Sequence, residues 1–344
     1  MFIMNAWYVI AMPREVGRTP LARTVCGVPV VLFRTEDGTP AALHDECPHR
    51  RVALSRGTVK GDTIECGYHG FCFDREGRCT HVPGTDRISP KLHGRAFPLE
   101  LKYDWLWIWP GDPALADPAA IPDMHWKTEP GWAAEGNMIE FDCHYELLSD
   151  NLLDLTHEAF VHKRTIGNPA VAETPMTARR DGERVHVDRI MRGIPAPPLF
   201  QKVRDFSGEI DRYQLVRFEP PANIWIDAFA YPAGTEDASR GMRWMVMNSL
   251  TPSSPYRTYY FYSLSRSFSV EDEALTALIE DQLRLTFFED KDLIEEQQRI
   301  ILKDDPTGAE LVASACDAGN VYARRIVQER IAAEAAAAEN VAAE

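Results

Sequence analysis

The sequence predicts an α+β protein in two parts. An all-β domain over residues 1–112 precedes a second domain over residues 113–344, a helix-flanked antiparallel sheet. Three observations predict this division: short strand-like runs with turn residues fill the first part, longer strands and two helical stretches fill the second, and a proline-rich stretch over residues 110–122 separates them. A chain of 344 residues is long enough for two such domains.

The first domain is read from strands that end at turns. Residues 28–34 are β-branched and apolar and end at the turn 36–38, and residues 106–109 form a late apolar strand closed by Pro110-Gly111.

The second domain alternates strands with helices. Residues 138–145 alternate as a strand, and a helix is expected from Glu146 to about Phe160. Further strand-like runs lie near residues 185–189, 213–218, 224–231, 243–250 and 259–264. A long amphipathic helix is expected from Glu271 to about Lys303, and the Ala/Glu tail after Ile331 is expected to be helical.

Composition excludes several classes of protein. The net charge of −15 argues against non-specific nucleic-acid binding. No stretch reaches the roughly 18 apolar residues that a membrane span needs, and the N-terminus lacks a signal peptide's basic region, so we expect a cytoplasmic protein with no membrane partner. Seven scattered cysteines argue against a disulfide framework.

The strongest motif joins two cysteines and two histidines. Cys47 and His49 form a C-x-H pair, and Cys66 and His69 form a C-x-x-H pair sixteen residues beyond the first. Two thiolates with two imidazoles suit either structural zinc or a Rieske [2Fe–2S] cluster. Each pair mixes one Cys with one His, and both lie at expected hairpin tips, which favours the Rieske cluster over zinc or over ordinary buried cysteines.

Glycine and proline shape the two loops of this motif. Pro48 stiffens the first loop, and Gly67 and Gly70 permit the close backbone approach that a cluster needs.

A second constellation lies on the first helix of the second domain. Asn151, Asp154 and His157 are spaced by three and share a helical face, and His162 follows five residues later. We expect the helix to end or distort near His162 and bring it back toward His157. Two histidines with one carboxylate form the facial triad of non-haem Fe(II) oxygenases, although a packed or capping pair of histidines is the plainer alternative.

With both motifs in order, the chain resembles the Rieske non-haem iron oxygenases, and within them the vanillate O-demethylase branch. The resemblance extends over nearly the full length, including Asn5-Ala6-Trp7-Tyr8-Val9, Trp107-Ile108-Trp109-Pro110-Gly111-Asp112, residues 150–158 and Asp317-Ala318-Gly319-Asn320-Val321. It implies an N-terminal Rieske domain and a C-terminal mononuclear iron catalytic domain. One departure is Phe71, where many relatives have Trp, and we expect it to affect packing more than ligation.

The resemblance assigns roles to the motif residues. The cluster ligands would be Cys47, His49, Cys66 and His69, and the iron ligands His157, His162 and an acidic residue of the late helix. For that residue we favour Asp290, which Glu295 follows at the family's spacing, over Asp292. The resemblance also implies that Asp154 bridges the two metal sites across the subunits of a homotrimer, and that Asn151 lies near the iron.

The implied function is that of a terminal oxygenase. A separate flavin/iron–sulfur reductase would carry electrons from NADH to the cluster, and O2 would be activated at Fe(II) to demethylate a methoxylated aromatic acid such as vanillate, a lignin-derived aromatic, with release of formaldehyde. The alternatives are hydroxylation of a ring or methyl group of another aromatic acid, a Rieske electron carrier without chemistry of its own, and a zinc-stabilised binding module.

Substrate contacts are predicted only as candidates. Asn248 and Arg266 are polar candidates, each with a structural role as the plainer reading. Aromatic candidates for the pocket are Tyr231, Trp244, Tyr260, Tyr262 and Phe287, all of them also consistent with ordinary core.

Overall fold

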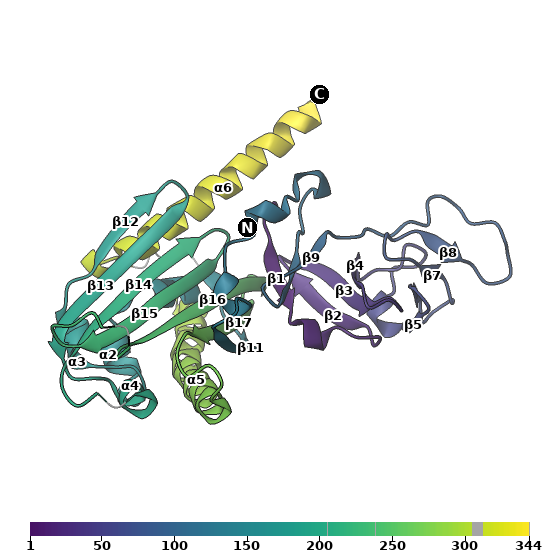
Figure 1. Cartoon of the computed structure of the whole chain (residues 1–344). Helices are drawn as coiled ribbons and strands as arrows, with labels where there is room; N and C mark the ends of the chain where they lie inside the picture. Colours follow the sequence, from purple (N-terminus) through teal and green to yellow (C-terminus); the bar gives the residue numbers. More distant parts are fainter. Residues whose placement is uncertain (205, 238, 305–311, 344) are drawn as a thin grey trace. The chain divides into compact units, whose positions relative to one another are not determined.

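The computed structural model describes residues 1–204, 206–237, 239–304 and 312–343 (Figure 1). The chain divides into two compact units. The first comprises residues 1–121 with Thr251–Ser254, and the second comprises residues 122–250 and 255–344. Each unit is described by itself below.

The first unit is built from three small antiparallel sheets, in agreement with the all-β domain that the sequence predicts. Their strand orders are β1-β10-β9, β2-β3-β4 and β5-β6-β7-β8. The strands are β1 (Tyr8–Ala11), β2 (Leu21–Val25), β3 (Val28–Arg34), β4 (Pro40–His44), β5 (Thr58–Lys60), β6 (Thr63–Glu65), β7 (Cys72–Phe73), β8 (Cys79–His81), β9 (Leu99–Lys102) and β10 (Trp105–Ile108). Short 3-10 helices lie at η1 (Pro13–Glu15), η2 (Leu54–Arg56), η3 (Pro113–Leu115) and η4 (Pro118–Ala120).

One apolar core anchors both metal-motif loops of this unit. Phe33, Leu54 and Phe73 are fully buried, and Cys47 and Cys66 are only 2% exposed in the same cluster of side chains. Both thiols are therefore held by packing that is independent of any ligand.

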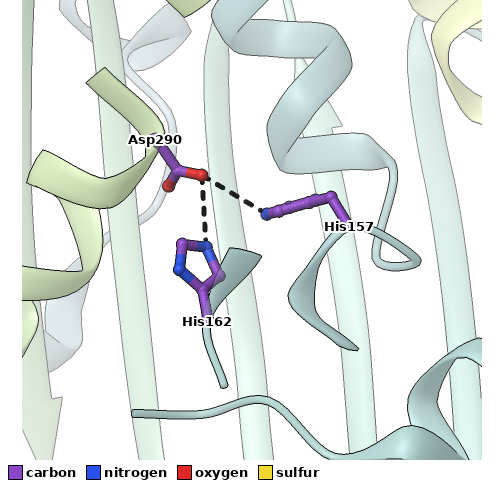
Figure 2. Close-up of side chains that lie close together, drawn as sticks. All are labelled: His157, His162 and Asp290. Atoms are coloured by element: carbon purple, nitrogen blue, oxygen red, sulfur yellow. Dashed lines mark ion pairs between the residues drawn. The ribbon is translucent and has the colours of Figure 1, made fainter. Parts of the chain in front are cut away.

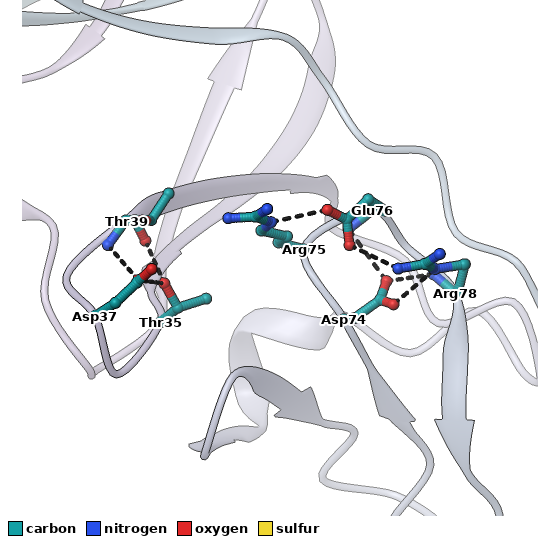
Figure 3. Close-up of polar contacts among 7 residues, drawn as sticks. All are labelled: Thr35, Asp37, Thr39, Asp74, Arg75, Glu76 and Arg78. Atoms are coloured by element: carbon teal, nitrogen blue, oxygen red, sulfur yellow. Dashed lines mark hydrogen bonds and ion pairs between the residues drawn. The ribbon is translucent and has the colours of Figure 1, made fainter.

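Carboxylates shape two exposed turns of the first unit (Figure 3). Asp37 accepts hydrogen bonds from the Thr35 hydroxyl at 2.5 Å and the Thr39 backbone N–H at 2.9 Å, and these bonds lower the pKa of Asp37 to about 2. Asp74 likewise accepts from the Arg78 backbone N–H and guanidinium, both at 2.8 Å. The second turn leads from β7 into β8, so it fixes the hairpin that follows the second motif loop.

The second unit is a seven-stranded sheet with the order β11-β17-β16-β15-β14-β13-β12. Strands β12 to β16 pair antiparallel with their neighbours, as does β11 with β17. The strands are β11 (Ala133–Phe141), β12 (Thr177–Asp181), β13 (Arg184–Ile194), β14 (Ile210–Glu219), β15 (Asn223–Pro232), β16 (Met242–Ser254) and β17 (Arg257–Arg266). The predicted α+β class is confirmed. Strand β12, rich in charged side chains, was not predicted.

Helices cover this sheet. They are α1 (Tyr145–Leu153), α2 (Glu158–Val161), α3 (Pro169–Glu173), α4 (Pro198–Val203), α5 (Glu273–Asp304) and α6 (Ala318–Ala343), with η5 (His125–Lys127) and η6 (Ala315–Asp317). Helix α5 contacts β11, α6 contacts β12 and β13, and α1 contacts both α5 and α6 (Figure 1). The long helix and the helical tail lie where the sequence predicts them.

Two sequence expectations near the start of this unit are wrong. The strand ends at Phe141 and does not reach Tyr145, because the His144 imidazole caps α1 by accepting from the Glu146 N–H. The expected single helix from Glu146 to Phe160 is two helices, since α1 ends at Leu153 and α2 begins at Glu158.

No helix of the described residues is long and apolar enough to cross a membrane. The seven cysteines, all within the described ranges, form no disulfide.

Candidate metal centres and substrate cavity

The four residues of the first motif come together at the tips of two loops. The first loop follows β4 and the second joins β6 to β7. The imidazole centroids of His49 and His69 are 4.7 Å apart, and Phe71 stacks on His49 at 4.5 Å and an interplanar angle of 7°. Phe71, the residue that departs from the resemblance, therefore packs beneath one of the imidazoles.

The donor set of these loops fits a mixed-ligand cluster. Burial raises the pKa of the Cys47 thiol, and the neighbouring Cys66 thiol adds to the rise, so two adjacent thiols share one pocket. The His49 Nδ1 atom is buried without a hydrogen-bond partner among the described residues, which leaves it free as a ligand. Gly67 makes the close approach expected of it, because a Cβ there would lie 2.7 Å from the Arg56 carbonyl oxygen.

The second constellation forms one compact group, His157, His162 and Asp290 (Figure 2). One oxygen of Asp290 lies 3.2 Å from Nε2 of His162 and 3.6 Å from Nε2 of His157. The three ligand atoms lie within 4.8 Å of one another, and they form the only such group of three or more among the described residues. Asp290 is 5% exposed and His162 is 1% exposed.

Hydrogen bonds fix the tautomers of both histidines. Nδ1 of His157 contacts the Asp154 carbonyl oxygen, and Nδ1 of His162 lies 2.9 Å from a Glu289 carboxylate oxygen. Both partners only accept, so each Nδ1 carries the proton and donates it. Each Nε2 then offers its lone pair toward Asp290, which is the arrangement that a metal with two imidazoles and one carboxylate requires.

The two neighbouring carboxylates raise the pKa of His162, so this group of side chains favours a positive charge. Burial alone would lower the pKa of His162, but the hydrogen bond and charge of Asp290, together with Glu289, raise the pKa of His162 to about 9. The carboxylates thus stabilise positive charge at His162, where a metal ion would supply it instead of a proton.

The break between α1 and α2 positions the first histidine. Asp154 leaves the helical conformation (φ −96°, ψ 95°), and its side chain accepts from the Thr156 N–H at 2.8 Å. A short polar side chain that accepts from a backbone N–H two residues further on competes with the helix. This competition explains the break, which the sequence analysis placed too late. His157 is then the N-cap residue of α2, and His162 is its C-cap residue.

A glycine brings His162 back toward the group. The Gly167 N–H donates to the His162 carbonyl oxygen at 2.8 Å, and a Cβ on Gly167 would lie 2.4 Å from the Glu158 carbonyl oxygen and 2.7 Å from that of His162. Any side chain at this position would therefore displace the end of α2.

The other predicted residues lie around the group in different ways. The Asn151 amide donates to Asp290 at 3.1 Å. Asp154 does not join the three, and it lies on the wall of an open groove of about 1080 Å³ that His157 and Asp290 also line. Asp292 is exposed on α5, two residues beyond Asp290.

The polar substrate candidates are engaged elsewhere. Asn248 accepts from the Tyr260 hydroxyl at 2.9 Å and donates to the Ile224 carbonyl, and Arg266 donates to the carbonyls of Ser269 and Asp272. Neither residue lines the smaller cavity beside His157 and His162 that is described next. These contacts agree with a structural role, which the sequence analysis gave as the plainer reading of both residues.

A second, smaller cavity of about 80 Å³ lies against the same histidines and Asp290. Among the aromatic candidates, Trp244 and Phe287 line it. Its buried polar wall, made by Glu158, Arg212 and Gln214, was missed by the sequence analysis. Gln214 lies within the predicted strand 213–218, but Arg212, which shares its face two residues earlier, lies just before that range.

Comparison with known proteins agrees with both halves of this description. Residues 6–98 match the Rieske [2Fe-2S] domain, and residues 141–333 match the vanillate O-demethylase oxygenase C-terminal domain. The vanillate O-demethylase oxygenase subunit of Pseudomonas sp. strain HR199 is 35% identical over 341 residues, covering 96% of each chain. The toluene-4-sulfonate monooxygenase iron–sulfur subunit of Comamonas testosteroni is 34% identical, covering 93% of this chain and 94% of that one.

A solved structure shows the same fold over the full length. Dicamba monooxygenase bound to 3,6-dichlorosalicylic acid has a TM-score of 0.92 and 32% identity, covering 97% of this chain and 99% of that one. The two units and their metal motifs thus define a Rieske non-haem iron monooxygenase. The chain belongs to the vanillate O-demethylase oxygenase family. Its cofactors are a Rieske [2Fe–2S] cluster and a mononuclear non-haem iron, with O2 as cosubstrate and NADH supplying electrons through a reductase.

Gly167 lies close to the carbonyl oxygens of Glu158 and His162, so a substitution there tests whether this glycine positions His162 in the iron site. Gly167→Ala should displace His162 and destabilise the unit by about 1–3 kcal/mol, because the new methyl group overlaps two carbonyl oxygens. Iron analysis should find less iron in this variant, while the visible absorption of the cluster is kept. Gly208→Ala is the matched control, since a Cβ there meets no heavy atom within 4 Å. A full iron complement in Gly167→Ala would contradict the positioning role.

Proposed function

We propose that this oxygenase catalyses oxidative O-demethylation of a methoxylated aromatic acid such as vanillate. The observation that carries the proposal is the narrow, largely apolar cavity that begins at His157, His162 and Asp290. Such a cavity favours an aromatic ring that presents one small group to the metal. Relatives named for vanillate and dicamba O-demethylation support the same substrate class.

In this proposal one domain binds the cluster and the other binds the iron. Residues 1–112 hold the cluster through Cys47, His49, Cys66 and His69, and residues 113–344 hold the iron through His157, His162 and Asp290. When bound, the cluster supplies electrons singly and the iron supplies activated oxygen. The chain's own residues fix the two imidazole tautomers, keep the carboxylate buried and hold the methoxy carbon at the open side of the site.

The reaction balances with one O2 and one NADH. One oxygen atom enters the methoxy carbon as a hydroxyl group, and the other leaves as water with two electrons from NADH and protons from solvent. The hydroxylated methyl ether is a hemiacetal, which breaks at its carbon–oxygen bond to give a phenol and formaldehyde. A flavin/iron–sulfur reductase is the proposed electron donor.

Mass balance tests this reaction. With a matched reductase and NADH, a panel of methoxylated aromatic acids should include one that yields one formaldehyde per phenol formed. Product analysis by chromatography and a formaldehyde assay measure the ratio. Consumption of the acid without formaldehyde would favour the second candidate outcome, hydroxylation of a ring or of a methyl group on carbon. Asp292→Asn is the control variant, and its exposed side chain should leave the ratio unchanged.

We also propose that the enzyme is a head-to-tail homotrimer in which Asp154 links the iron of one chain to the cluster of the next. Two features support this role. The Asp154 backbone carbonyl accepts from His157, and its side chain lies on the open groove that leads to the iron ligands. A carboxylate in this position can accept an imidazole N–H from an approaching cluster ligand.

Two measurements test whether Asp154 links the iron of one chain to the cluster of the next. Asp154→Asn should keep both the cluster spectrum and the iron content and lower turnover by about 100-fold, in line with the larger losses seen when partners of metal-ligand histidines are removed. Asp181→Asn, an exposed change of the same chemistry, should be neutral. Near-normal turnover in Asp154→Asn would remove the bridging role. Co-expression of His69→Ala with His162→Ala should restore activity that neither has alone, and no restoration would contradict transfer between chains.

A further inference from the structure

The cavity beside the iron ligands contains one polar wall in otherwise apolar surroundings. Arg212 and Gln214 of β14 face it from the sheet, and Glu158 of α2 lies between them. The Glu158 carboxylate accepts from Nη2 of Arg212 at 2.9 Å and from Nε2 of Gln214 at 2.7 Å. All three residues are less than 5% exposed, so the set is built into the fold.

The charge of this wall is already balanced. Arg212 pairs with Glu158, and its Nη1 also donates to the Ile166 carbonyl oxygen at 2.9 Å. Among the described residues that line the cavity, Arg212 is the only lysine or arginine. No unmatched cation therefore remains there for a carboxylate, and the wall favours an uncharged polar group of the ligand.

The Gln214 amide has a fixed orientation. A carboxylate only accepts, so the nitrogen of the amide must face Glu158 and the oxygen must take the other position. That oxygen, Oε1, is buried and has no hydrogen-bond partner among the described residues, and the same is true of Nε of Arg212. Both residues line the cavity, and each keeps one polar atom without a partner in the described structure, an acceptor on Gln214 and a donor on Arg212.

We propose that Gln214 is a specificity-determining residue, whose Oε1 accepts a hydrogen bond from a hydroxyl group on the substrate ring. A hydroxyl group both donates and accepts, which matches the two unpaired groups. A ring hydrogen or a second methoxy group cannot donate, and an ionised phenolate would be repelled by Glu158. Because buried polar groups left unpaired are costly, a site of this kind rejects analogues that lack the hydroxyl. The inference rests on the proposed function, and it narrows the substrate to hydroxylated aryl methyl ethers.

Equilibrium binding tests the proposal. Calorimetry of the iron-loaded full chain under anaerobic conditions compares 3-methoxybenzoate with its 2-, 4- and 5-hydroxy derivatives and with 3,4-dimethoxybenzoate. At least one hydroxy derivative should bind about tenfold tighter than the parent acid, the gain of one buried hydrogen bond. The dimethoxy compound, which cannot donate, should bind no tighter than the parent.

Variants assign that preference to one side chain. Gln214→Leu removes the acceptor at similar size and should reduce the preference to within about threefold. Gln201→Leu, the same change at an exposed position outside the cavity, should keep the preference. A wild-type enzyme that does not distinguish the hydroxy derivatives from the parent overturns the proposal, and so does an unchanged preference in Gln214→Leu. If Gln214→Leu does not fold, the wild-type comparison with the dimethoxy compound decides.

The outcomes separate this inference from the proposed function. Formaldehyde release without any hydroxyl preference contradicts the role of Gln214 and leaves O-demethylation standing. A hydroxyl preference in binding without formaldehyde release supports the role of Gln214 and contradicts O-demethylation.

Discussion

The buried carboxylate of Asp290 is the interaction on which the second unit depends. A carboxylate that is 5% exposed carries a desolvation penalty unless a cation or several donors compensate it. The described structure supplies two imidazoles and the Asn151 amide at 3.1 to 3.6 Å. These groups come from α1, the α1–α2 break and the end of α2, so three segments of the chain converge on one oxygen atom of an α5 side chain.

The same residues face two different spaces. Asn151, His157 and Asp290 line both the large open groove and the small apolar cavity. The groove is rimmed by charged side chains such as Asp150 and Arg324, which pair with one another, whereas the cavity is closed by Trp244 and Phe287 on its apolar side. An iron held by these residues would face the charged groove on one side and the apolar cavity on the other. The groove suits the proposed electron transfer from a cluster, and the cavity suits the proposed aromatic substrate.

The sequence predicted a large part of this arrangement. The mixed Cys/His motif, the pair His157 and His162, and the preference for Asp290 over Asp292 all rested on residue type, spacing and family resemblance. The fold gathers His157, His162 and Asp290 into one group, brings the ring centroids of His49 and His69 within 4.7 Å, and leaves Asp292 exposed. The α+β class and most strands followed from alternation and turn residues. The long helix over α5 followed from its amphipathic period.

The features that the sequence analysis missed have one local cause and one tertiary cause. The break after Leu153 arises because the Asp154 carboxylate accepts a hydrogen bond from the Thr156 backbone N–H, a local competition that helix periodicity does not reveal. Arg212 and Gln214 look like surface residues of a strand, since charged and amide side chains are mostly exposed. Only the carboxylate of Glu158, brought from a distant helix, explains their burial. The placement of Arg212 and Gln214 on the same strand face as the apolar Val216 and Phe218 was the signal available.

The central claim is that Asp290 completes a mononuclear iron site with His157 and His162 that is separate from the cluster. Iron analysis of the purified chain, with the cluster followed by its visible absorption, tests this claim most directly. The wild-type chain should hold three irons, and Asp290→Ala should hold two with an unchanged cluster spectrum. Three irons in Asp290→Ala, or loss of the cluster instead of the single iron, would contradict the account.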